Sequence, residues 1–241
     1  MIATTIGFFR SLAALLFWLI TAPPAALIAF PWTLITGNVN FLYWVGMSLA
    51  YAGVRVAGAK AKLVGLENLD PKATYIFMSN HVSNLDPPLL IPKLPGRTSV
   101  LAKKVIWRVP ILGTALNLAE IVPVDRSNRD SAIQSIRRAG EVMKHHIHMT
   151  IFPEGTRSPD GRLMPFKKGP FHLAAETGVP IVPVTILGTY EMMPKRNSIV
   201  RSGTATLVLH PPVDPAQFSS REELMQRVWD QINSALPAER Q

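Results

Sequence analysis

The segment His81-Val-Ser-Asn-Leu-Asp86 places an imidazole five residues before a carboxylate. Histidine suits general-base catalysis because its ordinary pKa lies near neutral pH. A carboxylate bonded to one ring nitrogen fixes the tautomer and stabilises the imidazolium. Residues five apart lie on different faces of a straight helix, so the pair meets only if the segment turns, as Ser83, Asn84 and the prolines after Asp86 favour. The pair is therefore a candidate for removing a proton from a hydroxyl group.

A second interpretation of Asp86 needs no catalysis. Asp86 precedes Pro87, and proline is favoured at the first position of a helix that an aspartate caps. His81 would then be a hydrogen-bonded histidine at the end of a strand. The two roles are compatible, because a capping carboxylate still has an oxygen for His81.

A second segment with residues suited to chemistry is Phe152-Pro-Glu-Gly-Thr-Arg157; we call this segment and His81–Asp86 the two chemical segments. A guanidinium matches phosphate in bidentate fashion, so Arg157 indicates an anionic substrate. Backbone N–H groups in the Gly155-Thr156 turn are further candidates for facing a phosphate. Glu154 would orient Arg157 or Arg126, or accept a hydrogen bond from a substrate hydroxyl. The alternative is a surface turn with a Glu–Arg ion pair that contributes little.

The sequence from about residue 60 alternates short apolar runs with helical patterns, which predicts an α/β fold with a mainly parallel sheet flanked by helices. The predicted strands are Lys62–Val64, Tyr75–Met78, Ser99–Ala102, Ile121–Val124, Thr150–Phe152, Ile181–Ile186 and Thr204–Leu209. The clearest predicted helices are Asp130–His146, Gly169–Thr177 and Arg221–Leu236.

The two chemical segments and the pair Asp125-Arg126 each follow a predicted strand in this pattern. His81 comes just after one predicted strand, Asp125-Arg126 after another and Glu154–Arg157 after a third. Ligands of open α/β sheets bind at the carboxyl ends of the strands. We therefore expect these segments to share one site.

The front of the chain is apolar. No Asp, Glu, Lys or Arg occurs in the 44 residues 11–54, and the apolar stretches are Ile2–Thr21, Ala25–Thr36 and Phe41–Val54. We expect Pro23-Pro24 to break the helix between the first two. Positive residues on both sides predict a membrane hairpin, spanning or dipping, with both ends in the cytoplasm. The predicted division is residues 1–58 as anchor and 59–241 as the catalytic domain.

Other interpretations of the composition are weaker. A signal peptide over residues 1–26 would have prolines at its cleavage site, and buried core helices would not need so long a stretch without charge. The net charge of +9 suits anionic lipid, whereas no nucleic-acid-binding motif is visible. The chain has no cysteine, hence no thiolate nucleophile. The histidines at 145, 146 and 148 lack a carboxylate pattern for a metal, so no metal site is predicted.

Taken together, five blocks resemble the 1-acylglycerol-3-phosphate acyltransferases, the glycerolipid family with a His-x-x-x-x-Asp signature. The blocks are Asn80-His81 with Asp86, Lys103 in Leu-Ala-Lys-Lys, Val124-Asp125-Arg126, Phe152–Ser158 and Val179–Val184. They span about residues 75–190. Pro123 departs slightly from the Phe or Ile common at that position.

The resemblance implies that His81 and Asp86 are catalytic. It implies a substrate-binding set that consists of Lys103, Arg126, Glu154, Gly155, Thr156 and Arg157. The expected reaction transfers an acyl group from acyl-CoA or acyl-acyl carrier protein to the sn-2 hydroxyl of lysophosphatidic acid, without a cofactor. Membrane lipids are the expected partners, and the cytoplasmic face of the inner membrane is the expected location. Other lyso-lipid acceptors such as lyso-ornithine lipid, a lipid hydrolase and a non-catalytic lipid-binding protein remain alternatives.

Overall fold

The computed structural model describes residues 2–125 and 129–241. Its centre is a seven-stranded sheet in the order β1-β7-β6-β2-β5-β3-β4. The strands are β1 (Ala59–Val64), β2 (Ile76–Ser79), β3 (Thr98–Lys103), β4 (Val122–Val124), β5 (His148–Ile151), β6 (Ile181–Leu187) and β7 (Gly203–Leu209). Neighbours are parallel except β6 and β7, which are antiparallel.

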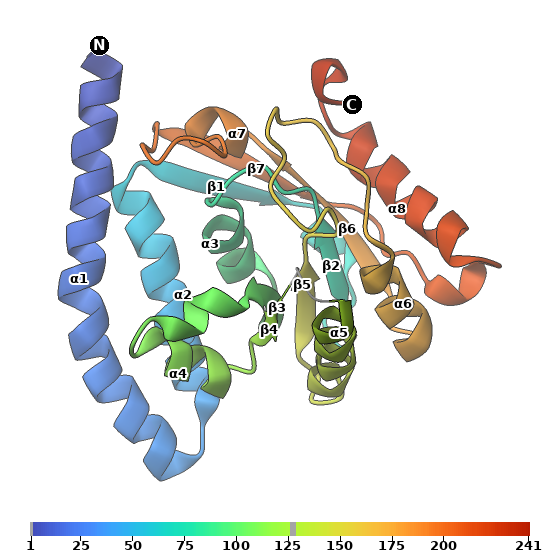
Figure 1. Ribbon diagram of the computed structural model, residues 1–241, viewed down its shortest axis with the longest axis horizontal. Helices are drawn as coiled ribbons and strands as arrows, with labels where there is room; N and C mark the ends of the chain where they lie inside the picture. Colours follow the sequence, from blue (N-terminus) through green and yellow to red (C-terminus); the bar gives the residue numbers. More distant parts are fainter. Residues whose placement is uncertain (1, 126–128) are drawn as a thin grey trace.

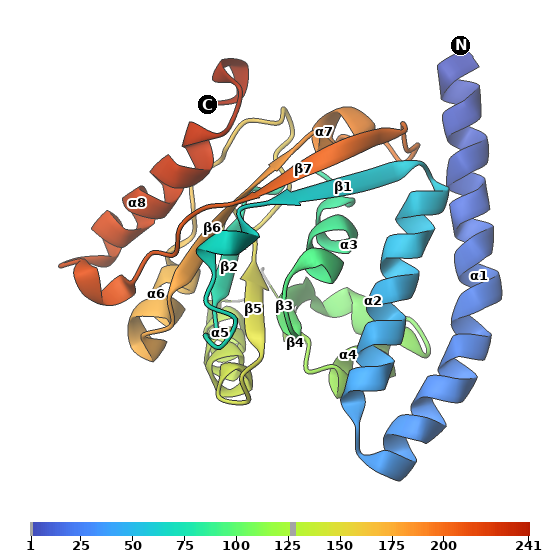
Figure 2. The same cartoon turned by 180° about the vertical axis from the view of Figure 1, so that it is seen from behind.

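Helices cover both faces of this sheet (Figures 1 and 2). One face packs against α5 (Arg129–Met143), α6 (Lys168–Thr177) and α8 (Arg221–Ser234). The other face lies over α3 (Asp86–Leu90), with α7 (Thr189–Met192) near its edge. The short helix η2 (Ile91–Lys93) follows α3 and contacts α2. The remaining short helices are η1 (Leu66–Asn68), η3 (Lys104–Arg108), α4 (Leu112–Leu118), η4 (Pro215–Gln217) and η5 (Ala238–Arg240).

The alternation of side chains along β2 explains the two cores. Ile76 and Met78 join the cluster under α5, α6 and α8, whereas Phe77 between them joins the opposite cluster. All three are 0% exposed. A strand buried on both faces reads as a continuous apolar run, as the central strands of a parallel sheet do.

The predicted α/β fold with a mainly parallel sheet is confirmed. Each predicted strand is present, with ends that differ by at most three residues. The helix predicted over Asp130–His146 ends earlier, at Met143. His146 has a φ of 57°, so the backbone has left the helix before that residue.

The expected break at Pro23-Pro24 is wrong. A single helix of 35 residues, α1 (Ile2–Thr36), contains Pro23, Pro24 and Pro31. Each interior proline removes one backbone hydrogen bond and bends a helix without having to end it. Figure 1 shows α1 bending in the part that holds the prolines. The chain instead turns at Gly37, whose φ is 67°, before α2 (Val39–Val56).

The two N-terminal helices pack against each other as a hairpin, and they differ in how they contact the sheet. α1 lies on the outside of the molecule (Figures 1 and 2). Among the described residues, one helix, Thr5–Thr36, is long and apolar enough to cross a membrane. Only 6% of its most apolar stretch is buried, which disfavours the interpretation as a core helix.

α2 is fastened to the sheet. The buried Tyr43 hydroxyl accepts a hydrogen bond from Thr98 N (3.0 Å) and donates one to Thr98 O (3.3 Å). Thr98 begins β3, so α2 is joined to a strand of the catalytic body. α2 ends at Val56 and β1 begins at Ala59. The division at residue 58 therefore falls between α2 and β1. α2 nevertheless packs against α1, before this division, and against β1 and α3, after it.

Candidate active site

His81 and Asp86 meet beyond the carboxyl end of β2. His81 Nδ1 lies 2.8 Å from Asp86 Oδ2. The histidine side chain is 11% exposed and the aspartate side chain is 0% exposed. The imidazole therefore reaches the surface while its carboxylate partner is shielded from water. The other ring nitrogen, Nε2, is left for a substrate.

The segment turns because Asp86 holds its backbone. Oδ2 accepts hydrogen bonds from Val82 N and Ser83 N, each at 2.8 Å. These amides precede the helix α3, so the carboxylate closes the loop back to His81 and does not cap α3 itself. Leu85 occupies the N-cap position, which differs from the expected capping role of Asp86.

Glu154 joins the two chemical segments through the backbone. Its Oε1 accepts a hydrogen bond from His81 N (2.6 Å) and its Oε2 accepts one from Met164 N (3.2 Å). The residue is 2% exposed. Burial raises the pKa of this carboxyl to about 8, although the two backbone hydrogen bonds act to lower it. Glu154 is thus bound to backbone amides, where we expected contact with an arginine or a substrate.

A cavity of about 630 Å³ brings together most of the predicted site residues. Its lining includes His81, Phe152, Lys103 and the turn Gly155-Thr156-Arg157. Gly155 has a φ of 75°, a conformation that glycine adopts readily. The cavity is therefore lined by one candidate base, His81, and by two cationic side chains, Lys103 and Arg157. Asp86 is joined to this cavity through its hydrogen bond with His81, and Arg126 falls outside the described residues.

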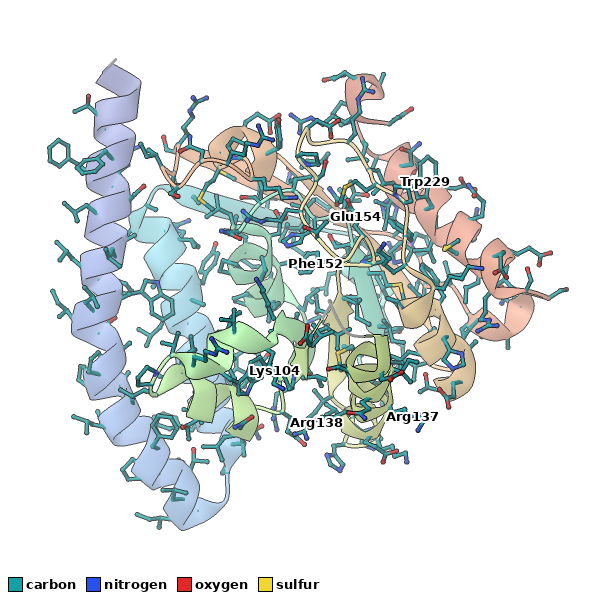
Figure 3. The ribbon with its side chains drawn as sticks, in the orientation of Figure 1. Lys104, Arg137, Arg138, Phe152, Glu154 and Trp229 are labelled. Carbon is teal, nitrogen blue, oxygen red and sulfur yellow. The ribbon has the colours of Figure 1, made fainter. Side chains whose placement is uncertain are left out.

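Three contributors to the site were missed by sequence reasoning. Phe152 stacks on the imidazole of His81, with ring centroids 4.1 Å apart. Asn80 exchanges two hydrogen bonds with the backbone of Ile186, which fixes the end of β2 against β6. Lys195 contacts the turn at Arg157. Phe152 and Asn80 lay within the noted motifs, whereas nothing in the sequence pointed to Lys195. Figure 3 shows Phe152 and Glu154 near the centre of the molecule, beyond β5.

His148, one of the three clustered histidines, belongs to the core. It is 8% exposed, and its Nδ1 accepts a hydrogen bond from Tyr75 N at 3.0 Å. Burial lowers the pKa of this imidazole. His145 lies on the surface beside Glu120. The two histidines therefore have separate surroundings.

Fold and site together define a class: an α/β enzyme with a histidine–carboxylate pair and cations at the carboxyl edge of its sheet. The family model described as Acyltransferase matches residues 60–187, which include every predicted site residue. The chain belongs to this acyltransferase family.

Similar proteins agree with this assignment. The chain is 35% identical over 212 residues to a 1-acyl-sn-glycerol-3-phosphate acyltransferase of Limnanthes douglasii, covering 86% of this chain and 74% of the relative. It is 38% identical over 168 residues to a chloroplastic 1-acyl-sn-glycerol-3-phosphate acyltransferase of Brassica napus, covering 69% of this chain. The match spans about half of that relative, 47% of its length.

A solved structure is similar over almost the whole chain. The crystal structure of the 1-acyl-sn-glycerophosphate acyltransferase PlsC from Thermotoga maritima superposes with a TM-score of 0.80 at 28% identity. The match covers 95% of each chain. It therefore extends beyond the sheet into the N-terminal helices.

Proposed function

We propose that the protein transfers an acyl group from an acyl-thioester to the sn-2 hydroxyl of lysophosphatidic acid, which forms phosphatidic acid. The observation that carries the proposal is one cavity that holds a carboxylate-bound imidazole and two cations. The imidazole suits an acceptor hydroxyl and the cations suit its phosphate. The names of the relatives give the same acceptor class.

The reaction needs one proton removed and returned. His81 Nε2 takes the proton of the acceptor hydroxyl as its oxygen attacks the thioester carbonyl carbon. Asp86, 2.8 Å from Nδ1, stabilises the imidazolium that forms. Collapse of the tetrahedral intermediate breaks the carbon–sulfur bond, and the imidazolium proton passes to the departing sulfur. The products are an ester and a free thiol.

The phosphate of the acceptor is assigned to Arg157 and Lys103. Both line the cavity with His81, and Lys103 is exposed at the end of β3. A lipid with a free hydroxyl and a phosphate places its reacting oxygen near the imidazole when its phosphate meets these cations. Arg126 remains a predicted third phosphate ligand.

The N-terminal helices support attachment to a membrane. The exposed apolar residues of α1 include Leu19, Ile20 and Leu27, each more than 60% exposed. Such a surface is stable in contact with lipid. We assign residues 1–58 to an anchor on the cytoplasmic face of the inner membrane, where acyl-CoA and acyl-acyl carrier protein are available. The product of the reaction would then form beside the bilayer.

The test is an assay of the full chain in lipid vesicles, with labelled acyl-CoA or acyl-acyl carrier protein and several lyso-lipids. The proposal expects phosphatidic acid from lysophosphatidic acid with at least one donor. Preference for another lyso-lipid, such as lyso-ornithine lipid, would reassign the acceptor. Release of free fatty acid in place of ester would indicate a hydrolase. Binding of lysophosphatidic acid without turnover would indicate a lipid-binding protein.

A further inference from the structure

The segment 193–202, which joins α7 to β7, touches both chemical segments of the site. Ser83 Oγ, within the His81–Asp86 loop, donates a hydrogen bond to Met193 O at 2.7 Å. Two residues later, Lys195 Nζ donates to Arg157 O at 2.7 Å and lies 3.4 Å from Thr156 Oγ1. One short segment therefore contacts the loop of the candidate base and the turn of the candidate phosphate ligand.

The contact between Lys195 and Arg157 is reciprocal. The ammonium of Lys195 binds the carbonyl of Arg157, and Nη1 of Arg157 reaches the carbonyl of Lys195 at 3.4 Å. Each side chain thus holds the backbone of the other residue. Both residues are half-buried, so these hydrogen bonds are partly protected from water. The direction of the Arg157 guanidinium consequently depends on where Lys195 lies.

Lys195 and Arg157 bring two positive charges to this contact. Within residues 2–125 and 129–241, neither Lys195 nor Arg157 forms an ion pair with a carboxylate. Glu154 and Asp160 are the acids nearest to Arg157 in sequence. Both oxygens of Glu154 accept hydrogen bonds from backbone amides, and Asp160 Oδ1 accepts hydrogen bonds from Ser158 Oγ and Arg162 N. Two neighbouring cations repel each other unless an anion lies between or beside them. A phosphate dianion bound by Arg157 would supply negative charge beside this contact.

The same segment is also fastened to the N-terminal helix. Val200 N donates a hydrogen bond to Ser11 Oγ at 2.9 Å, and Ser11 Oγ in turn donates to Gly7 O at 2.9 Å. A Cβ at Gly7 would lie 2.9 Å from Ile199 Cγ2, so α1 approaches the segment closely there. Lys195 is therefore held on a segment whose far end is anchored on α1.

We propose that Lys195 is a positioning residue for the acceptor phosphate: it fixes the turn at Arg157 and thereby sets the direction of the guanidinium. This inference rests on the proposed function, in which Arg157 binds the phosphate. Lys195 acts through Arg157 and not as a separate phosphate ligand. The link to α1 fastens this positioning contact to the helix that meets the lipid.

The experiment measures the KM for lysophosphatidic acid and the KM for the acyl donor in purified Lys195→Met, which keeps the apolar stem and removes the charge. We expect the acceptor KM to rise about 10-fold to 100-fold, the range for one charge-assisted hydrogen bond, while the donor KM stays within about twofold. Lys195→Arg, which keeps a donor, should restore most of the affinity. Lys72→Met, an exposed lysine before β2 at the opposite edge of the sheet, is the matched control.

A double-mutant cycle with Arg157→Ala separates positioning from direct binding. If Lys195 acts through Arg157, Lys195→Met should change the acceptor KM less than about twofold in the Arg157→Ala background. Equal effects in both backgrounds would show a direct phosphate contact and overturn the inference. An unchanged acceptor KM in Arg157→Ala alone would instead overturn the proposed phosphate site. Should Lys195→Met fail to fold, Lys195→Arg carries the test, and a rise above about tenfold in its acceptor KM contradicts the inference.

Discussion

At the scale of single residues, the candidate base is held by its backbone as much as by its side chain. His81 N donates to Glu154 Oε1 at 2.6 Å, and His81 O accepts a hydrogen bond from Ser158 N at 2.7 Å. The backbone N–H and the backbone C=O of His81 therefore each form one hydrogen bond to the segment that holds Glu154 and Ser158. Displacing either segment would move the imidazole relative to the cations of the cavity.

The buried carboxyl of Glu154 predicts a pH dependence of stability. Its pKa is about 8 in the folded protein against 4.5 for an ordinary glutamate, so folding takes up a proton between these values. The contribution of Glu154 to the free energy of unfolding should be full below about pH 4.5 and should be lost as the pH rises through about 8. Urea unfolding at several pH values measures it.

Glu154→Gln is the variant that tests this dependence. The amide does not titrate, so the difference in unfolding free energy between the protein and the variant should shrink as the pH rises across that window. One amide N–H of the glutamine would face a backbone donor, which lowers stability at every pH. A difference that stays constant from pH 5 to pH 9 would show that Glu154 is already ionised in the folded protein.

Arg157→Ala should weaken binding of the phosphate-bearing acceptor more than binding of the donor. Loss of a charge-assisted hydrogen bond costs about 1.5–3 kcal/mol, which is about 10-fold to 100-fold in the acceptor KM. Steady-state kinetics with each substrate varied in turn measures the two effects. Equal losses for both substrates would indicate that Arg157 only shapes the turn.

At the scale of elements, the sequence predicted the sheet well and the N-terminal helices less well. The strands are short, rich in Val and Ile and bounded by turn residues, so local pattern sufficed to find them. The break predicted at Pro23 and Pro24 is absent because a long apolar helix can bend where a proline removes a backbone hydrogen bond. Lys195 was not predicted as a site residue because it lies 38 residues from Arg157 in sequence and contacts it only in the folded protein.

The fastening of α2 to β3 predicts a loss of stability in Tyr43→Phe. The hydroxyl serves both the N–H and the C=O of Thr98, and its removal leaves two buried backbone groups without this partner. The free energy of unfolding should fall by about 1–3 kcal/mol. Tyr51→Phe on the same helix is the control, because the contacts of Tyr51 within the described residues are made by its ring, under Arg55 and Lys93, and its hydroxyl forms no hydrogen bond there. Equal stabilities of the two variants would contradict the role of Tyr43.

At the scale of the whole molecule, the proposed location follows from placing an apolar hairpin beside a basic catalytic body. The net charge is +9, and the 44 residues 11–54 contain no charged side chain. Basic residues near the bilayer are attracted to anionic lipids, and apolar helices enter it. The active site would thereby stay at the surface from which its lipid acceptor comes.

This arrangement predicts that both ends of the hairpin face the cytoplasm. Thr5→Cys and Lys62→Cys place single thiols near the start of the hairpin and just after it, in a chain that has no other cysteine. Neither should react with an impermeant thiol reagent added outside intact cells, and both should react after the membrane is opened. Labelling of either one in intact cells would overturn the topology.

The central claim is that His81 is the general base, and the turnover rate of His81→Ala tests it most directly. The purified full-length variant in lipid vesicles should lose about 10²–10⁴-fold in kcat, since that is the usual contribution of a general base. Its unfolding transition and its binding of lysophosphatidic acid should stay close to those of the unmodified protein. A variant that keeps more than half of the activity would contradict the mechanism.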